Sequence, residues 1–185
     1  MAYVAIAGRC LIGVVFLWAV VGKLHPRSAF HSFAASIQEL PGMSGRNPRA
    51  VAGLVVTTEA AVTLLLMSGT TALAGLGLAW VLLAAFVVVI AAALRRGAAA
   101  PCRCFGTAVV PLSRRHLIRN GLLIVVTSAA AVGAAGSGSA LPAGILVAIP
   151  AGVLGAFVLV FFDDIVGLFA DQPSRRSAVT PGRPG

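Results

Sequence analysis

The chain has 185 residues, of which 59% are hydrophobic and 10% are charged, and its mean hydropathy is +1.00. Soluble domains carry about 25% charged residues, so this composition excludes an ordinary soluble globular protein. A formal net charge of +9 would favour nucleic-acid binding in a soluble chain, but aromatic residues make up only 6% and no basic groove motif is present. We therefore expect an integral membrane protein without a nucleic-acid partner.

Five apolar runs, each close to the ~20 residues that cross a bilayer, predict transmembrane helices. They cover about residues 2–22, 50–67, 72–94, 117–135 and 141–162. The predicted fold is all-α, a polytopic membrane helical bundle within residues 1–170, with a four-helix core and a fifth transmembrane helix. Residues 171–185 are expected to form a disordered tail. The first run lacks a basic start and a small-residue cleavage site, so we expect no cleaved signal peptide.

The first run ends at Lys23, whose ammonium is expected to reach the membrane interface. In the connector that follows, Phe30, Phe33, Ile37 and Leu40 recur at i, i+3, i+7 and i+10. This spacing is typical of one face of a helix. It predicts either a short amphipathic helix in the interface or a loop that packs its aromatic side chains on the bundle.

Two charged residues fall inside apolar runs, Arg9 in the first and Glu59 in the second. A charge in hydrocarbon is costly, so each should face the bundle interior and find a partner. We expect them to form a direct or water-bridged pair if their helices are neighbours. That pair would serve structure, binding or proton transfer. Cys10 points to a different helix face and is expected to be a small buried apolar residue.

The connector between the third and fourth runs carries two of the three cysteines, in the sequence Pro101-Cys102-Arg103-Cys104-Phe105-Gly106. A disulfide across one intervening residue would be strained and easily reduced, which suits a disulfide that is transferred to another protein. Arg103 would favour the thiolate. Pro101 would restrain the start of the loop, and Gly106 would permit a turn in which Phe105 covers the sulfurs.

Two other interpretations of the same sulfurs remain open. Two thiolates can bind a soft ion such as Cu(I), with His116 or Cys10 as a further ligand. The chain has no second cysteine pair, so a closed four-ligand zinc site is not expected. Alternatively, the cysteines are unreactive residues in a non-catalytic membrane subunit.

The charge distribution predicts an orientation. With five spans, the connectors over residues 23–49 and 95–119 share one side with the C-terminal tail, and together they hold every Lys and Arg except Arg9. The positive-inside rule places this side in the cytoplasm and the N-terminus outside. Oxidising thiol chemistry usually belongs outside the cytoplasm. Charge and chemistry therefore favour opposite orientations for the cysteine pair.

Several of these features together resemble the methylamine utilisation protein MauE family, which is grouped with DoxX-like membrane proteins. They are the Pro-Cys-x-Cys-Phe-Gly run before a helix, an acidic Glu59 in the second span, and the pattern Arg9…Gly13…Phe16…Gly22-Lys23-Leu24. The resemblance covers about residues 9–135. It implies a bacterial inner-membrane or plasma-membrane helical bundle linked to thiol or disulfide chemistry. In methylamine metabolism, the family is required for maturation of the small subunit of methylamine dehydrogenase.

The layout also resembles vitamin K epoxide reductase-type enzymes, in which a cysteine pair begins the fourth helix and meets a quinone. Here the pair is Cys-x-Cys and the first connector has no second pair, which argues against an independent quinone-linked oxidase. The resemblance leads us to predict that Cys102 and Cys104 form a redox site that assists disulfide formation in a partner protein, with a quinone or a partner thiol as electron acceptor. The supporting residues are expected to be Pro101, Arg103, Phe105, Gly106, Arg9, Glu59 and Lys23. The alternative is a membrane metal-handling assembly factor that uses Cys102, Cys104 and His116.

Overall fold

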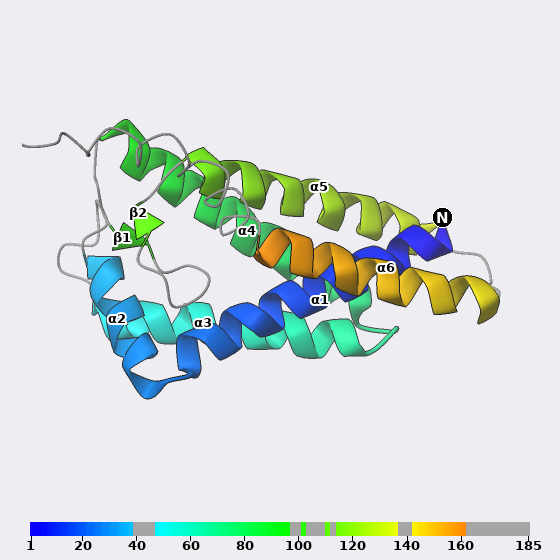
Figure 1. The fold of residues 1–185 in the computed structure, drawn as a ribbon, viewed down its shortest axis with the longest axis horizontal. Helices are drawn as coiled ribbons and strands as arrows, with labels where there is room; N and C mark the ends of the chain where they lie inside the picture. Colours follow the sequence, from blue (N-terminus) through cyan, green and yellow to red (C-terminus); the bar gives the residue numbers. More distant parts are fainter. Residues whose placement is uncertain (39–46, 97–100, 103–109, 112–113, 137–141, 162–185) are drawn as a thin grey trace, which may run out of the picture.

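The structure, a computed structural model, describes residues 1–38, 47–96, 101–102, 110–111, 114–136 and 142–161 (Figure 1). Five of the helices in this part of the chain are long and apolar enough to cross a membrane. They are α1 (Ala2–Leu24), α3 (Pro48–Met67), α4 (Ala72–Arg95), α5 (Arg114–Ala135) and α6 (Pro142–Val160). The predicted all-α polytopic bundle is therefore confirmed.

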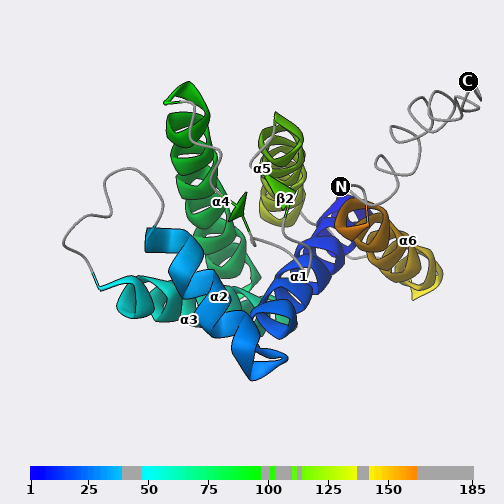
Figure 2. The same ribbon diagram turned by 60° about the vertical axis from the view of Figure 1, so that its left-hand side comes forward.

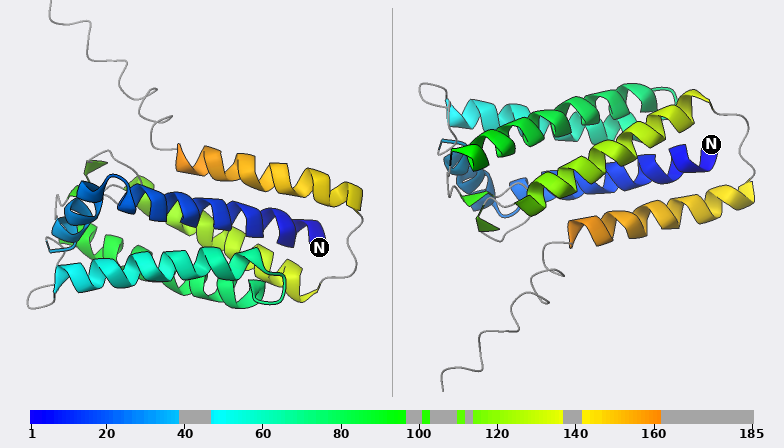
Figure 3. Two further views of the ribbon diagram at one scale, coloured as in Figure 1. Left: turned by 90° about the horizontal axis from the view of Figure 1, so that it is seen from below. Right: turned by 90° about the horizontal axis from the view of Figure 1, so that it is seen from above.

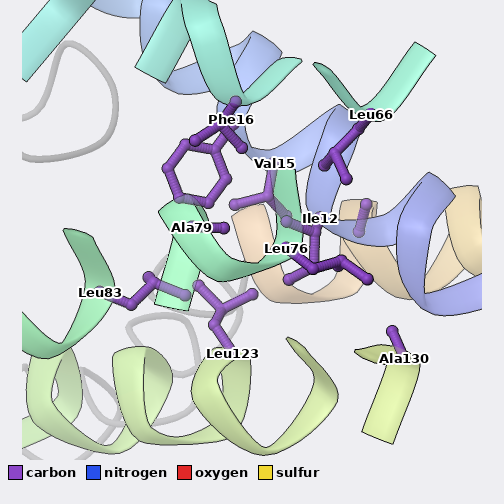
Figure 4. Packing of buried hydrophobic residues seen from close by; sticks show 11 residues of the cluster. Ile12, Val15, Phe16, Leu66, Leu76, Ala79, Leu83, Leu123 and Ala130 are labelled. Atoms are coloured by element: carbon purple, nitrogen blue, oxygen red, sulfur yellow. The ribbon is translucent and has the colours of Figure 1, made fainter. Parts of the chain in front are cut away.

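Helix α1 is the centre of the bundle. It packs against α3, α5 and α6, while α4 packs against α3 and α5. Helices α1, α3, α4 and α5 therefore enclose the core, and α6 lies outside it against α1 (Figures 2 and 3). Figure 4 shows the interior, where these helices bring together the buried apolar side chains of Ile12, Val15, Phe16, Leu66, Leu76, Ala79, Leu83, Leu123 and Ala130.

Large apolar side chains also cover the outside of the spans. Leu64 on α3 is 66% exposed, Val88 on α4 is 67% exposed and Val132 on α5 is 69% exposed. Such an apolar surface is stable in contact with lipid hydrocarbon. In that environment a helix satisfies its backbone hydrogen bonds internally, without water. Surface and span length together identify a multi-pass membrane protein in a lipid bilayer.

Small residues allow the spans to approach closely. A Cβ atom added to Gly152 of α6 would lie 2.3 Å from the carbonyl oxygen of Ala7 on α1. One added to Gly8 would lie 2.6 Å from the Cβ atom of Ala130 on α5. Backbones in membranes commonly come this close at small residues, where dispersion contacts replace the hydrophobic effect. The two glycines thus set how near α6 and α5 lie to α1.

A shorter helix, α2 (Arg27–Gln38), follows α1 and corresponds to the expected amphipathic segment. Its buried side chains Phe33, Ala34 and Ile37 pack against Ala52 and Val56 of α3. The spacing therefore produces a helix, and the apolar face of that helix is turned to the bundle. Leu40, the last residue of the pattern, lies outside the described residues, as do residues 171–185 of the expected tail.

The connector between α4 and α5 contains a small antiparallel ladder. Strand β1 (Pro101–Cys102) pairs with β2 (Val110–Pro111), with Pro101 opposite Pro111 and Cys102 opposite Val110. Strand β1 packs on α2. The backbone of Cys102 is therefore placed beside a helix that joins the first two spans.

Candidate functional site

One end of the bundle gathers the short elements. Helix α2 and the β1–β2 ladder lie there, together with the end of α1 and the beginnings of α3 and α5 (Figures 1 and 3). Helix α2 contacts α1, α3 and β1, so it connects the strand that carries Cys102 to two of the spans. Lys23 and the polar residues at the start of α5 belong to this end, whereas Arg9 lies toward the other end, beside the last residues of α3.

A buried ion pair joins α1 to α3. The Nζ atom of Lys23 donates a hydrogen bond of 2.5 Å to Oε1 of Glu59, and the two side chains are only 3% and 1% exposed. The ammonium also lies 5.1 Å from the centre of the Phe33 ring on α2. A cation over an aromatic face is attracted by the quadrupole of the ring. The Lys23 ammonium therefore holds three helices together at one point.

This position corrects the expectation that Lys23 extends to the membrane interface. A lone ammonium near a helix end gains hydration by reaching outward. Here a carboxylate within the bundle offers a direct charge partner, and the low dielectric strengthens their attraction. Burial in the pair therefore replaces contact with the interface. The second carboxylate oxygen of Glu59, Oε2, is buried and has no hydrogen-bond partner within the part of the chain that the structure describes.

Arg9 does not pair with Glu59 as expected. Its Nε atom donates to the carbonyl oxygen of Leu66, and its Nη2 atom donates to that of Met67 at 2.7 Å. The last carbonyls of a helix lack partners within the helix, so they readily accept hydrogen bonds from a guanidinium. Because α1 and α3 run antiparallel, a late residue of α1 meets Glu59, and Arg9 meets the end of α3.

The first turns of α5 bury three polar side chains that face the bundle. His116 is 8% exposed, and Arg119 and Asn120 are each 3% exposed. The Nδ2 atom of Asn120 donates to the carbonyl oxygen of His116 at 2.8 Å. His116 was predicted only as an alternative metal ligand, and neither Arg119 nor Asn120 was predicted as a site residue. Their spacing of i, i+3 and i+4 at the start of an apolar run was the available signal, since it puts them on one helix face.

Most of the predicted cysteine motif lies outside the described residues. The structure places Pro101 and the backbone of Cys102 in β1, but the side chain of Cys102 and all of Arg103, Cys104, Phe105 and Gly106 are not described. The thiol of Cys10 is free and half-buried. Within the described ranges, no group of three or more His, Cys, Asp or Glu side chains could hold a metal ion.

The family model described as methylamine utilisation protein MauE matches residues 1–136. The chain belongs to this family. The match extends from α1 to the end of α5, so the MauE part comprises the four-helix core, α2 and the ladder. Helix α6 follows it. No curated protein and no solved structure gives a significant match to this MauE-family chain.

Proposed function

We propose that this MauE-family membrane protein exchanges disulfides with a partner protein through Cys102 and Cys104. In the oxidising direction, a partner thiolate attacks the Cys102–Cys104 disulfide, and one of the two sulfurs leaves as a thiolate. A second partner thiolate then resolves the mixed disulfide. The partner has lost two electrons and two protons, and the Cys102–Cys104 pair has gained them as a dithiol. Transfer of both to a quinone, which becomes a quinol, or to another disulfide would restore the pair.

The observation that carries this proposal is the support beneath the cysteine strand. The backbone of strand β1 lies beside α2, and α2 places Phe33 against the ammonium of the buried Lys23–Glu59 pair. A site that meets a protein partner gains from a rigid platform, because less ordering is then required on contact. Lys23 and Glu59 are thus positioning residues, which act on the cysteines through α2.

The neighbouring residues complete the proposed site. Arg103 lies between the two cysteines in sequence, where a guanidinium would favour the thiolate form. Pro101 would stiffen the start of the loop, while Phe105 and Gly106 would cover the sulfurs and allow the turn. Arg9 supports the site only indirectly, through its hydrogen bonds to the end of α3.

Thiol trapping tests the proposal. Intact cells are quenched with acid, their thiols are alkylated, and the oxidation state of each cysteine is read by mass spectrometry. We expect a Cys102–Cys104 disulfide in wild type. We also expect the single variants Cys102→Ser and Cys104→Ser to accumulate different amounts of a mixed disulfide with a partner. Cys10→Ser is the matched control, because Cys10 is the remaining cysteine and lies in a span.

Two results would contradict the proposal. In the first, Cys102 and Cys104 stay reduced under every growth condition and the double Cys→Ser variant keeps full function. The protein would then be a non-catalytic membrane subunit. Bound Cu or Zn in purified wild type that disappears in the double variant would instead support metal handling, with His116 as a further ligand to test.

A further inference from the structure

A groove runs along α1, between α3 and α6. Its volume is about 440 Å³, and its walls come from α3 and α6. The lining follows α1 from Ile6 to Leu17, a length of about 16 Å at ~1.5 Å per residue. That is about half of the ~30 Å hydrocarbon thickness, enough to hold a large part of one acyl chain.

The groove is open to the surrounding membrane. Three of its lining residues are substantially exposed: Leu17 by 47%, Met67 by 70% and Ile149 by 43%. Gly13 has no side chain that could fill the groove, and a Cβ atom added there would meet nothing within 4 Å. A flexible apolar chain could therefore enter from the bilayer without first displacing a side chain.

The guanidinium of Arg9 gives this groove a charged end. Arg9 lines the groove and bonds to the last carbonyls of α3, at the level where that helix leaves the membrane for the short turn to α4. Those bonds use Nε and Nη2, so among the described residues the hydrogens of Nη1 stay available to a ligand. Carbonyl oxygens do not neutralise the cation, and no carboxylate in the described ranges forms an ion pair with Arg9.

We propose that this groove binds one anionic phospholipid, with an acyl chain along α1 and the headgroup phosphate on Arg9. A guanidinium forms strong paired hydrogen bonds with phosphate oxygens. Arg9 lies in the N-terminal half of α1, level with the last carbonyls of α3, and this position assigns the lipid to the leaflet on the side of the N-terminus. The inference is independent of the proposed thiol chemistry, because the groove lies along the spans and not at the ladder.

Native mass spectrometry of the detergent-solubilised full chain, titrated with phosphatidylglycerol or phosphatidylcholine, tests the site. We expect wild type to retain one phosphatidylglycerol molecule with about a fivefold preference, which corresponds to the ~1 kcal/mol that one Arg contributes near anionic lipid. Arg9→Gln should abolish the preference. Gly13→Phe should fill the floor and lower binding of both lipids.

Matched controls separate the site from general effects. Arg49→Gln removes an exposed charge from the other end of α3, and Gly77→Phe adds a ring at an exposed glycine of α4 that also has open space. Both should bind lipid like wild type. Equal binding of the two lipids by wild type would overturn the proposal, as would unchanged binding by Gly13→Phe. Full displacement of the lipid by inorganic phosphate would show a simple anion site and would also overturn it.

Discussion

Removing both charges of the Lys23–Glu59 pair should destabilise the bundle by less than the two single losses added together. Both side chains are at most 3% exposed, so Glu59→Gln leaves a buried ammonium and Lys23→Met leaves a buried carboxylate. Breaking a buried pair from one side typically costs about 3–5 kcal/mol. The double variant Lys23→Met with Glu59→Gln buries no charge, so its loss should be smaller than the sum of the single losses by about 2–3 kcal/mol.

The measurement is unfolding in mixed micelles by titration with dodecyl sulfate, followed by circular dichroism. Arg49→Gln is the control, because Arg49 is exposed in the first turn of α3 and its loss should change stability by no more than about 0.5 kcal/mol. If the loss in the double variant equals the sum of the single losses within about 0.5 kcal/mol, the two groups do not interact. The buried Lys23–Glu59 ion pair would then be refuted.

Three further predictions concern other parts of the molecule. Gly152→Ala should cost about 1–3 kcal/mol because its methyl group would collide with the Ala7 carbonyl, whereas Gly77→Ala should cost little in the same unfolding assay. Phe33→Leu should lower stability by about 1 kcal/mol through loss of the cation–aromatic contact and change the alkylation rate of Cys102 in the reduced protein. An unchanged alkylation rate would show that α2 does not influence the thiol site. After reduction, a membrane-impermeant maleimide should label Cys102 and Cys104 in inverted vesicles but not in whole cells, as charge predicts. Labelling in whole cells would reverse this orientation.

The spans were predictable because hydrocarbon selects for a simple property, an apolar run of sufficient length. Their ends were less predictable. Helix α5 begins at Arg114, three residues before the expected Leu117. The earlier start was missed because the first turn is polar. Only the burial of His116 and Arg119 in the structure shows that this turn belongs to the bundle. Apolar content alone does not detect such a turn.

The partners of buried charges could not be read from single helices. Arg9 and Glu59 were matched because each lies in hydrocarbon with opposite sign, but the antiparallel register of α1 and α3 brings Lys23 to Glu59 instead. Register depends on how neighbouring side chains fit, which a hydropathy pattern does not contain. The cysteine motif stays a prediction, since Cys104 and the side chain of Cys102 lie outside what the structure describes.

The buried ion pair bears on membrane insertion. Lys23 and Glu59 are separated by 36 positions, so the residues of the first span are made before Glu59. Lys23 sits one residue from the end of α1, where its ammonium could reach the lipid headgroups until a partner arrives. Glu59 would then enter the hydrocarbon with a cation nearby, and the first span would lower the cost of inserting the second.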